Sequence, residues 1–375
     1  MFVTGAGTLG DLVGDLVAYR SLRPCDERLA DFQVPPLPPR KNEPGYAPVV
    51  GGLLQQARQL DVPKARLRHL LVVGDNAASD GVAFENLCAR FGWSGSAVIV
   101  DERFELAETG QQEIRSADRR QILLPRWADL REWAHSVAAS DIDEGTVVLL
   151  DIDKTLLGAR GRNDVVIDHA RSRAMRRVVA EALEADFDVE VFERARQIPS
   201  AGEFQRFTGD NQDYVAYIAL VASAGILTAE ELADLVRGGQ IPDVGALVER
   251  VEAASGDQPA TARAVFDAIA KRIRAGDPTP FKRFRKLEYE ETLACMGRAG
   301  EMSIDTRLRE ELVLTGEVID VARHWKAQGA LLFALSDKPD EAALPDEALQ
   351  QAGYRPLHHV RTHVVDSSQR SPRSV

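Results

Sequence analysis

The sequence predicts an α/β protein with a Rossmann-like parallel sheet, helices on both faces of the sheet, and a large α-helical cap insertion. Short apolar runs at 70–74, 96–100, 147–151 and 330–335 alternate with helical segments. This alternation is typical of a parallel, helix-covered sheet. The region 164–323 is rich in charged helical sequence and has no such alternation, so it is predicted to be a separate helical layer inserted into the sheet domain.

Each element is predicted from its periodicity and its flanking residues. Buried strands in a parallel sheet read as continuous apolar runs, whereas helices show apolar residues three and four apart. Proline pairs preclude regular structure in the stretch 22–48. In chain order we expect a helix at 49–60, a strand at 70–74, a helix at 84–90, strands at 96–100 and 122–124, a helix at 128–138, a strand at 147–151, a helix at 316–328 and a strand at 330–335.

These elements group into four parts. Residues 1–140 form a Rossmann-like α/β segment, and residues 141–163 and 324–365 form two further segments of a sheet core. Residues 164–323 form the helical insertion between them. The polar tail 366–375 is predicted to be disordered.

Composition restricts the classes of function. The chain has 375 residues, of which 45% are hydrophobic, and a net charge of −12, which argues against a general binder of nucleic acids or membrane surfaces. The longest apolar segment, 215–227, is too short to span a bilayer. Three widely separated cysteines show no metal-ligand spacing and fit a reducing cytoplasm. We therefore expect a cytoplasmic protein that binds neither nucleic acids nor a membrane.

The most informative motif is the apolar run Thr146–Leu150 that ends in Asp151-Ile152-Asp153-Lys154-Thr155-Leu156-Leu157. Its two carboxylates follow the carboxyl end of a predicted buried strand, where open α/β sheets bind their ligands. Two acids held together there can share a divalent cation or act as nucleophile and acid/base. The alternative to a functional site is a strand that ends in a turn with two solvent-exposed aspartates, because aspartate is common in turns.

The pattern D-x-D-x-T-L after a hydrophobic strand resembles the first motif of the haloacid dehalogenase superfamily, most of whose members are Mg²⁺-dependent phosphohydrolases. The resemblance implies that Asp151 is the nucleophile that takes the phosphoryl group. It implies that Asp153 is the acid/base and binds the metal through its backbone carbonyl, and that Thr155 holds the turn near the phosphate. Lys154 stands where many members have glycine.

The resemblance also implies a phosphate-binding hydroxyl, a lysine and further metal ligands. Ser336 follows the strand 330–335 and looks like the second motif, and Thr4 is a second candidate for the hydroxyl. Gly74-Asp75-Asn76-Ala77-Ala78-Ser79-Asp80 matches the fourth motif, G-D-x-x-x-x-D, whose acids complete a Mg²⁺ shell. The metal ligands implied are therefore Asp151, Asp153, Asp75 and Asp80.

The lysine is chosen by its place in the predicted sheet. Helices in a parallel sheet start at the edge where strands end, so a lysine facing phosphate should precede the helix 49–60. Lys41 meets this condition. Lys64 follows that helix and falls on the opposite edge, and Lys338 is a possible substitute.

The motifs stand in an order unlike that of the family, because the acidic motif at 75–80 precedes the nucleophile at 151. Either the chain is a circular permutation with one composite site, or it joins parts of two domains. Permutation is tolerated where chain ends are close. We favour the composite site, which requires Asp75 or Asp80 to reach the same metal as Asp151.

Two other classes of function stay open. Gly5-Ala6-Gly7-Thr8-Leu9-Gly10 spells the dinucleotide fingerprint of an NAD(P)-binding oxidoreductase, although no strand ending in an acid follows about 20 residues later. A catalytically inactive binding or regulatory protein would retain the same fold. His358, His359 and His363 have ligand-like spacing but no further partner in the sequence, and we interpret them as an edge strand or loop.

Overall fold

A computed structural model describes residues 1–103, 112–116, 118–137, 142–197, 204–209 and 211–367. The chain forms two compact units, which we describe separately. The first unit contains Met1–His169 and Thr292–Val375, and the second contains Ala170–Glu291. The prediction of a disordered tail from residue 366 is wrong at its start, because Asp366 is the buried last residue of the strand Thr362–Asp366; from residue 368 onward the tail lies outside the described residues.

The first unit is built on a seven-stranded sheet, which confirms the predicted fold class. Six strands are parallel, and β5 at one edge is antiparallel to its neighbour β6. The order across the sheet is β2 (Val17–Ala18), β9 (Leu331–Leu335), β7 (Thr146–Asp151), β3 (His69–Gly74), β4 (Ser94–Val100), β6 (Arg119–Leu124) and β5 (Gln112–Ser116).

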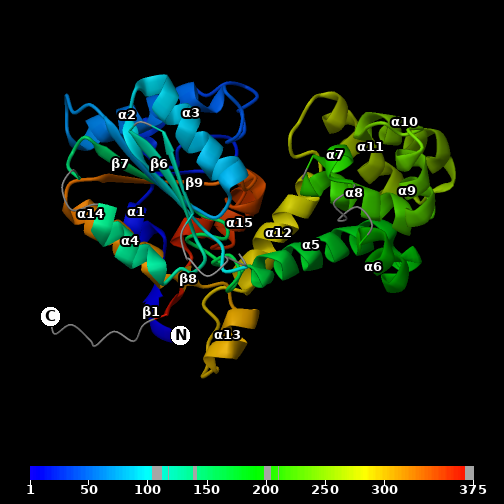
Figure 1. Cartoon of the computed structure of the whole chain (residues 1–375). Helices are drawn as coiled ribbons and strands as arrows, with labels where there is room; N and C mark the ends of the chain where they lie inside the picture. The colour runs from blue at the N-terminus through cyan, green and yellow to red at the C-terminus, as the bar shows by residue number, and fades with distance from the viewer. Residues whose placement is uncertain (104–111, 117, 138–141, 198–203, 210, 368–375) are drawn as a thin grey trace. The chain divides into compact units, whose positions relative to one another are not determined.

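Helices cover both faces of this sheet (Figure 1). On one face α2 (Tyr46–Asp61) and α3 (Val82–Phe91) bury an apolar cluster that includes Phe84 and Phe333, both fully buried. On the other face lie α4 (Asp129–Val137) and α14 (Gly316–Ala327), whose residues Trp133 and Trp325 meet edge to face with ring centroids 6.0 Å apart. Burial of the sheet on both faces explains why its central strands read as unbroken apolar runs.

The central strand β7 is the point at which the direction of winding reverses. From β3 the chain passes outward through β4 to β6, then returns to place β7 beside β3 and continues the other way to β9. Ligands of open α/β proteins bind in the crevice at such a switch point, outside the carboxyl ends of the strands. A ligand-binding site is therefore expected at the carboxyl ends of β3 and β7.

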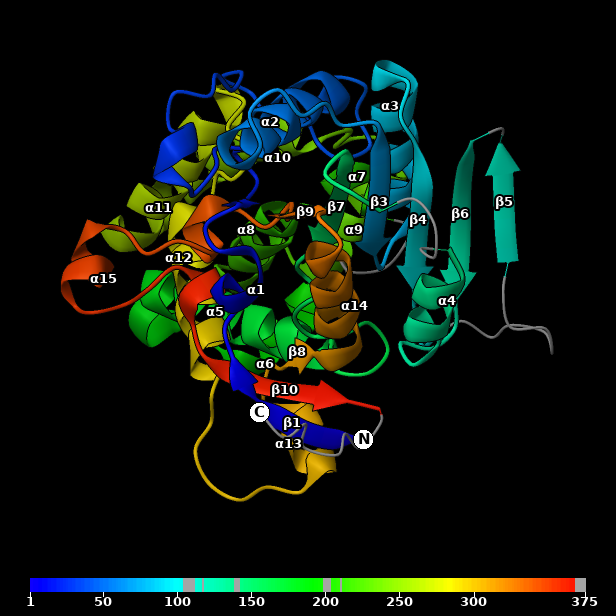
Figure 2. The ribbon, with the colours of Figure 1, turned by 90° about the vertical axis from the view of Figure 1, so that its left-hand side faces the viewer.

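A second, three-stranded sheet joins the two ends of the chain. Strand β1 (Phe2–Gly7) pairs antiparallel with β10 (Thr362–Asp366), and β10 pairs parallel with β8 (Leu314–Thr315). In Figure 2 the blue β1 lies alongside the red β10. This sheet was not predicted from the sequence. A four-residue helix, α1 (Gly10–Val13), follows β1.

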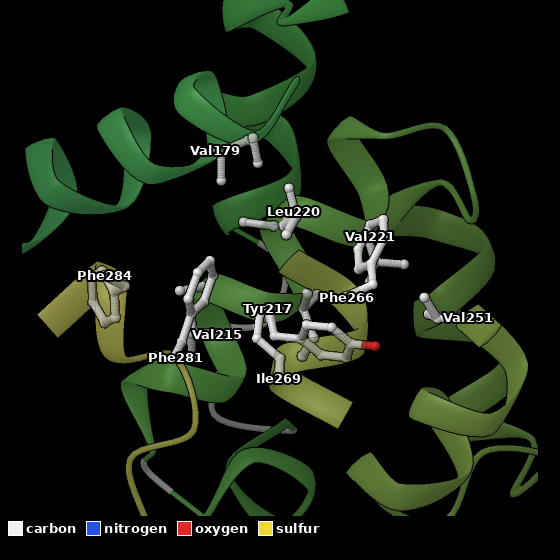
Figure 3. Packing of buried hydrophobic residues seen from close by; sticks show 14 of the residues in the cluster. Val179, Val215, Tyr217, Leu220, Val221, Val251, Phe266, Ile269, Phe281 and Phe284 are labelled. Atoms are coloured by element: carbon white, nitrogen blue, oxygen red, sulfur yellow. The ribbon is translucent and has the colours of Figure 1, made fainter. Parts of the chain in front are cut away.

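The second unit is helical. Its core surrounds α8 (Gln212–Ser223), where Val215, Tyr217 and Leu220 are almost completely buried, and Figure 3 shows these side chains packed with Phe266 and Phe281. The other helices are α5 (Val165–Leu183) and α12 (Lys282–Ala294), which carry the chain in and out, and α6 (Val189–Gln197), α7 (Gln205–Thr208), α9 (Ala229–Arg237), α10 (Val244–Ala254) and α11 (Ala260–Arg274).

This unit is shorter than the insertion 164–323 that we expected. The remaining elements of that range are α13 (Ile304–Glu310), β8 and the start of α14, and they belong to the first unit. The reason is structural, since β8 pairs within the three-stranded sheet and α14 covers the larger one. The short helix α15 (Glu347–Gln351), near the C-terminus, also lies in the first unit. No helix in the described part of the chain is long and apolar enough to cross a membrane.

Candidate functional site

Three carboxylates meet at the switch point. Asp151 ends β7, and Asp75 directly follows the neighbouring strand β3. One carboxylate oxygen from each of Asp75, Asp80 and Asp151 lies within 4.8 Å of the others, and all three residues are buried. Two segments far apart in sequence therefore contribute to one acidic cluster, as the composite arrangement requires.

Asp80 reaches the cluster because the chain turns back tightly after β3. A single turn of π-helix, Ala77–Gly81, begins at Asn76, whose side chain accepts a hydrogen bond from the backbone N–H of Ala78. The Oδ2 atom of Asp80 accepts from the backbone N–H groups of Asp75 and Asn76, both at 3.2 Å. A Cβ atom at Gly74 would lie only 2.4 Å from that oxygen, so glycine is needed at the end of the strand.

Lys41 lies inside this acidic cluster. Its Nζ donates to Oδ1 of Asp151 at 2.5 Å and to Oδ1 of Asp80 at 2.8 Å, and its side chain is 7% exposed. The lysine precedes α2, whose N-terminus lies at the edge where the parallel strands end, as the sequence analysis reasoned. Lys64, which we set aside, is exposed.

The turn after β7 carries the second aspartate of the motif. Lys154 adopts a left-handed conformation with φ of 66°, which explains why glycine suits this position. The Oδ2 atom of Asp153 lies 3.4 Å from Nζ of Lys338, whose side chain is 1% exposed. Lys41 and Lys338 thus contact different aspartates of the motif.

Two hydroxyls lie near this turn. Ser336 follows β9 directly, and Leu335 is in register with Asp151, so Ser336 lies at the same sheet edge as the acidic cluster. Its Oγ accepts from the backbone N–H of Lys338 at 3.0 Å. Thr155 is fully buried, and its Oγ1 has no hydrogen-bond partner among the described residues.

The other two sequence candidates lie elsewhere. Thr4 is in β1 of the three-stranded sheet, where its Oγ1 lies 3.5 Å from the carbonyl oxygen of Val364. The G-x-G-x-x-G segment spans β1 and the start of the four-residue α1. Because β1 pairs antiparallel with β10, the segment lacks the strand–turn–helix of a parallel sheet that dinucleotide binding uses. Of the two candidates for the hydroxyl of the second motif, Ser336 therefore lies at the acidic edge and Thr4 does not.

Arg160 was not predicted from the sequence. This residue follows the motif turn, and its backbone N–H donates to the carbonyl oxygen of Lys154 at 2.8 Å. Its Nη1 donates to Oδ2 of Asp75 at 2.7 Å. Nothing in the local pattern Gly158-Ala159-Arg160-Gly161 marks it, because the contact depends on a partner 85 residues earlier in the chain.

Burial first, and then the charges within the cluster, shift the pKa values of its members. Burial raises the pKa of Asp75 to about 7, with a further contribution from Asp80 and an opposing one from Arg160. Burial, opposed by Lys41, also raises the pKa of Asp151 well above its ordinary range. Burial alone would lower the pKa of Lys41, but Asp151 and Asp80 outweigh it and raise that pKa well above the usual value.

These residues fit a magnesium ion. Mg²⁺ prefers hard oxygen ligands, usually one or two carboxylates with water. Asp151 holds Lys41 with one oxygen, while its buried Oδ2 has no hydrogen-bond partner among the described residues. Asp80 already makes three hydrogen bonds, so Asp151 and Asp75 are the better side-chain ligands, and Asp80 serves to position Lys41.

Comparison of the chain with protein-family models, with curated proteins and with solved structures gave no significant match.

Proposed function

We propose that this protein is a Mg²⁺-dependent phosphohydrolase that acts on a small phosphorylated metabolite through an aspartyl-phosphate at Asp151. The observation that carries the proposal is the meeting of Asp151 with Asp75, Asp80 and Lys41 at the carboxyl edge of the sheet. The order of strands around β7 accounts for the permuted order of the motifs, since β3 and β9 flank it on either side.

The first half of the reaction forms a covalent bond to Asp151. A carboxylate oxygen of Asp151 attacks the phosphorus, and the bond from phosphorus to the leaving oxygen breaks. Asp153 supplies the proton that the leaving oxygen takes up. Its carboxylate is about a quarter exposed and can reach a bound substrate, unlike the buried Asp80.

The second half returns the enzyme to its starting state. Asp153, now a carboxylate, accepts a proton from water, and the resulting hydroxyl oxygen attacks the phosphorus. The bond between the phosphorus and Asp151 breaks, which releases inorganic phosphate and restores the Asp151 carboxylate.

Three other groups stabilise the charge on the phosphoryl group. Lys41 is held in place by two carboxylates, so its ammonium needs no reorganisation during the reaction. Ser336 supplies a hydroxyl at the same edge. Mg²⁺, bound by Asp151, Asp75 and the backbone of Asp153, would supply charge stabilisation for the phosphoryl oxygens.

Hydrolysis of p-nitrophenyl phosphate and of a panel of sugar and nucleotide phosphates, with and without Mg²⁺, tests the proposal. We expect Mg²⁺-dependent turnover that falls by about 10³-fold or more in Asp151→Asn, because the nucleophile is lost. Asp143→Asn is the matched control, since Asp143 ends a second D-x-D sequence, Asp141-Ile142-Asp143, and pairs with Arg68 on the surface. Absence of Mg²⁺-dependent turnover above the Asp151→Asn level across the panel would contradict the proposal and favour a binding or regulatory role.

A further inference from the structure

A second group of ligating side chains lies in the first unit, away from the acidic cluster. The Nε2 atoms of His358 and His359 lie 3.2 Å and 2.7 Å from the same oxygen, Oδ1 of Asp15. The ligating atoms of these three residues all lie within 4.8 Å of one another. From this geometry we propose that Asp15, His358 and His359 form a binding site for a transition-metal ion such as Zn²⁺.

The donor set selects the class of metal. Two imidazoles and one carboxylate suit Zn²⁺ and its neighbours in the first transition row, whereas Mg²⁺ and Ca²⁺ prefer sites made only of oxygen. Tetrahedral zinc with bonds of about 2.0–2.1 Å separates its ligand atoms by about 3.3 Å. The 3.2 Å from Asp15 to His358 is close to that value, whereas the 2.7 Å from Asp15 to His359 is shorter and would have to widen around an ion. Three protein ligands leave a fourth position for water.

The imidazole of His358 is held in an orientation suited to a ligand. It is 1% exposed, and its Nδ1 lies 3.1 Å from the hydroxyl oxygen of Tyr19. In the tautomer with the proton on Nδ1, that nitrogen donates to Tyr19 and the Nε2 lone pair faces Asp15. Metal-ligating histidines usually make such an outer hydrogen bond.

The backbone of the N-terminal segment also accommodates the site. A Cβ atom on Gly10 would lie 2.7 Å from Nδ1 of His359, so the close approach of α1 to this ring depends on glycine. Asp15 lies between α1 and β2, and the histidines end the 3₁₀-helix Leu357–His359. A bound ion would therefore link segments 343 and 344 residues apart, the same two ends of the chain that β1 and β10 join.

Calorimetric titration with Zn²⁺ of the full-length chain, freed of transition metals and held in excess Mg²⁺ to fill the acidic cluster, tests the inference. We expect one equivalent to bind, and His359→Ala and Asp15→Asn each to lower the affinity by about 10-fold or more. Tyr19→Phe should lower it by about 10-fold, because it removes the outer hydrogen bond without removing a ligand. Both His359 and Asp15 are partly exposed, so these two variants should keep the fold, which circular dichroism checks.

Two controls separate this site from other zinc binding. His324→Ala removes an exposed histidine whose ring lies 5.4 Å from that of His135, and it should bind Zn²⁺ as the native chain does. Asp151→Asn alters the acidic cluster and should also leave this binding unchanged. Binding that disappears only in Asp151→Asn, binding that is equal in all variants, or no binding by the native chain would each overturn the inference.

Discussion

Replacement of Lys41 by methionine tests the electrostatics of the acidic cluster without requiring a substrate. The cluster contains Asp75, Asp80 and Asp151 against Lys41 and Arg160, a formal net charge of −1 that becomes −2 in Lys41→Met. Methionine fills much of the space of the lysine stem, so the change removes mainly the charge and its two hydrogen bonds.

The expected loss of stability follows from the two distances. At 2.5 Å and 2.8 Å, and an effective dielectric constant of about 20, the Coulomb attraction of each ion pair is about 6 kcal/mol. Desolvation of the buried charges offsets most of this attraction. Removal of one partner from a buried pair leaves its carboxylates uncompensated, which costs about 3–5 kcal/mol. We expect Lys41→Met to lower the free energy of unfolding of the metal-free protein by that amount.

Urea unfolding with and without Mg²⁺ measures the effect. Lys64→Met is the control, because Lys64 is exposed and should change stability by less than about 1 kcal/mol. Mg²⁺ at 100 times its Kd stabilises a protein by about 2.7 kcal/mol. At one fixed Mg²⁺ concentration it should stabilise Lys41→Met more than the native chain, since a competing cation has been removed. Equal losses in the two lysine variants, with no added effect of Mg²⁺, would refute the reasoning.

Three further predictions concern other parts of the molecule. Arg285→Met should destabilise the helical unit by about 3–5 kcal/mol in urea unfolding, because it removes the cation 2.6 Å from the buried carboxylate of Asp213 and leaves the buried Glu288 with Arg171 alone. Arg283→Met, which removes a surface pair, should cost less than about 1 kcal/mol, and equal losses would contradict this. Burial, with nearby acidic side chains, raises the pKa of Cys25 to about 12, so its alkylation rate followed by mass spectrometry should still rise above pH 9. A rate that levels off near pH 9 would contradict the raised pKa. Lys154→Val should lower the free energy of unfolding by about 1–2 kcal/mol because of the left-handed backbone, whereas Lys154→Gly should not, and equal effects would count against this conformation.

The sheet could be predicted because its signal is local. Strands β3, β4, β7 and β9 are buried on both faces, so each reads as a short apolar run without help from the rest of the chain. The same reasoning placed Lys41 at the correct edge, because the direction of a parallel sheet fixes where its helices begin. The small strand β2 has only two residues, too few to give a pattern.

The features that escaped prediction depend on partners distant in sequence. Strand β1 is exposed along most of its length and pairs with β10, about 360 residues later, so no periodicity marks it. Thr4 was proposed as a phosphate ligand only because the sheet to which β1 belongs was unknown. Arg160 was missed for the same reason, since only the folded chain brings it to Asp75.

A crystal structure of the protein with Mg²⁺ and beryllium fluoride, a stable mimic of a phosphoryl group, tests the central claim most directly. The account predicts the fluoride adduct on the carboxylate of Asp151, with one Mg²⁺ bound by both Asp151 and Asp75. An adduct on any other residue, or carboxylates of Asp75 and Asp151 that bind no common ion, would contradict it.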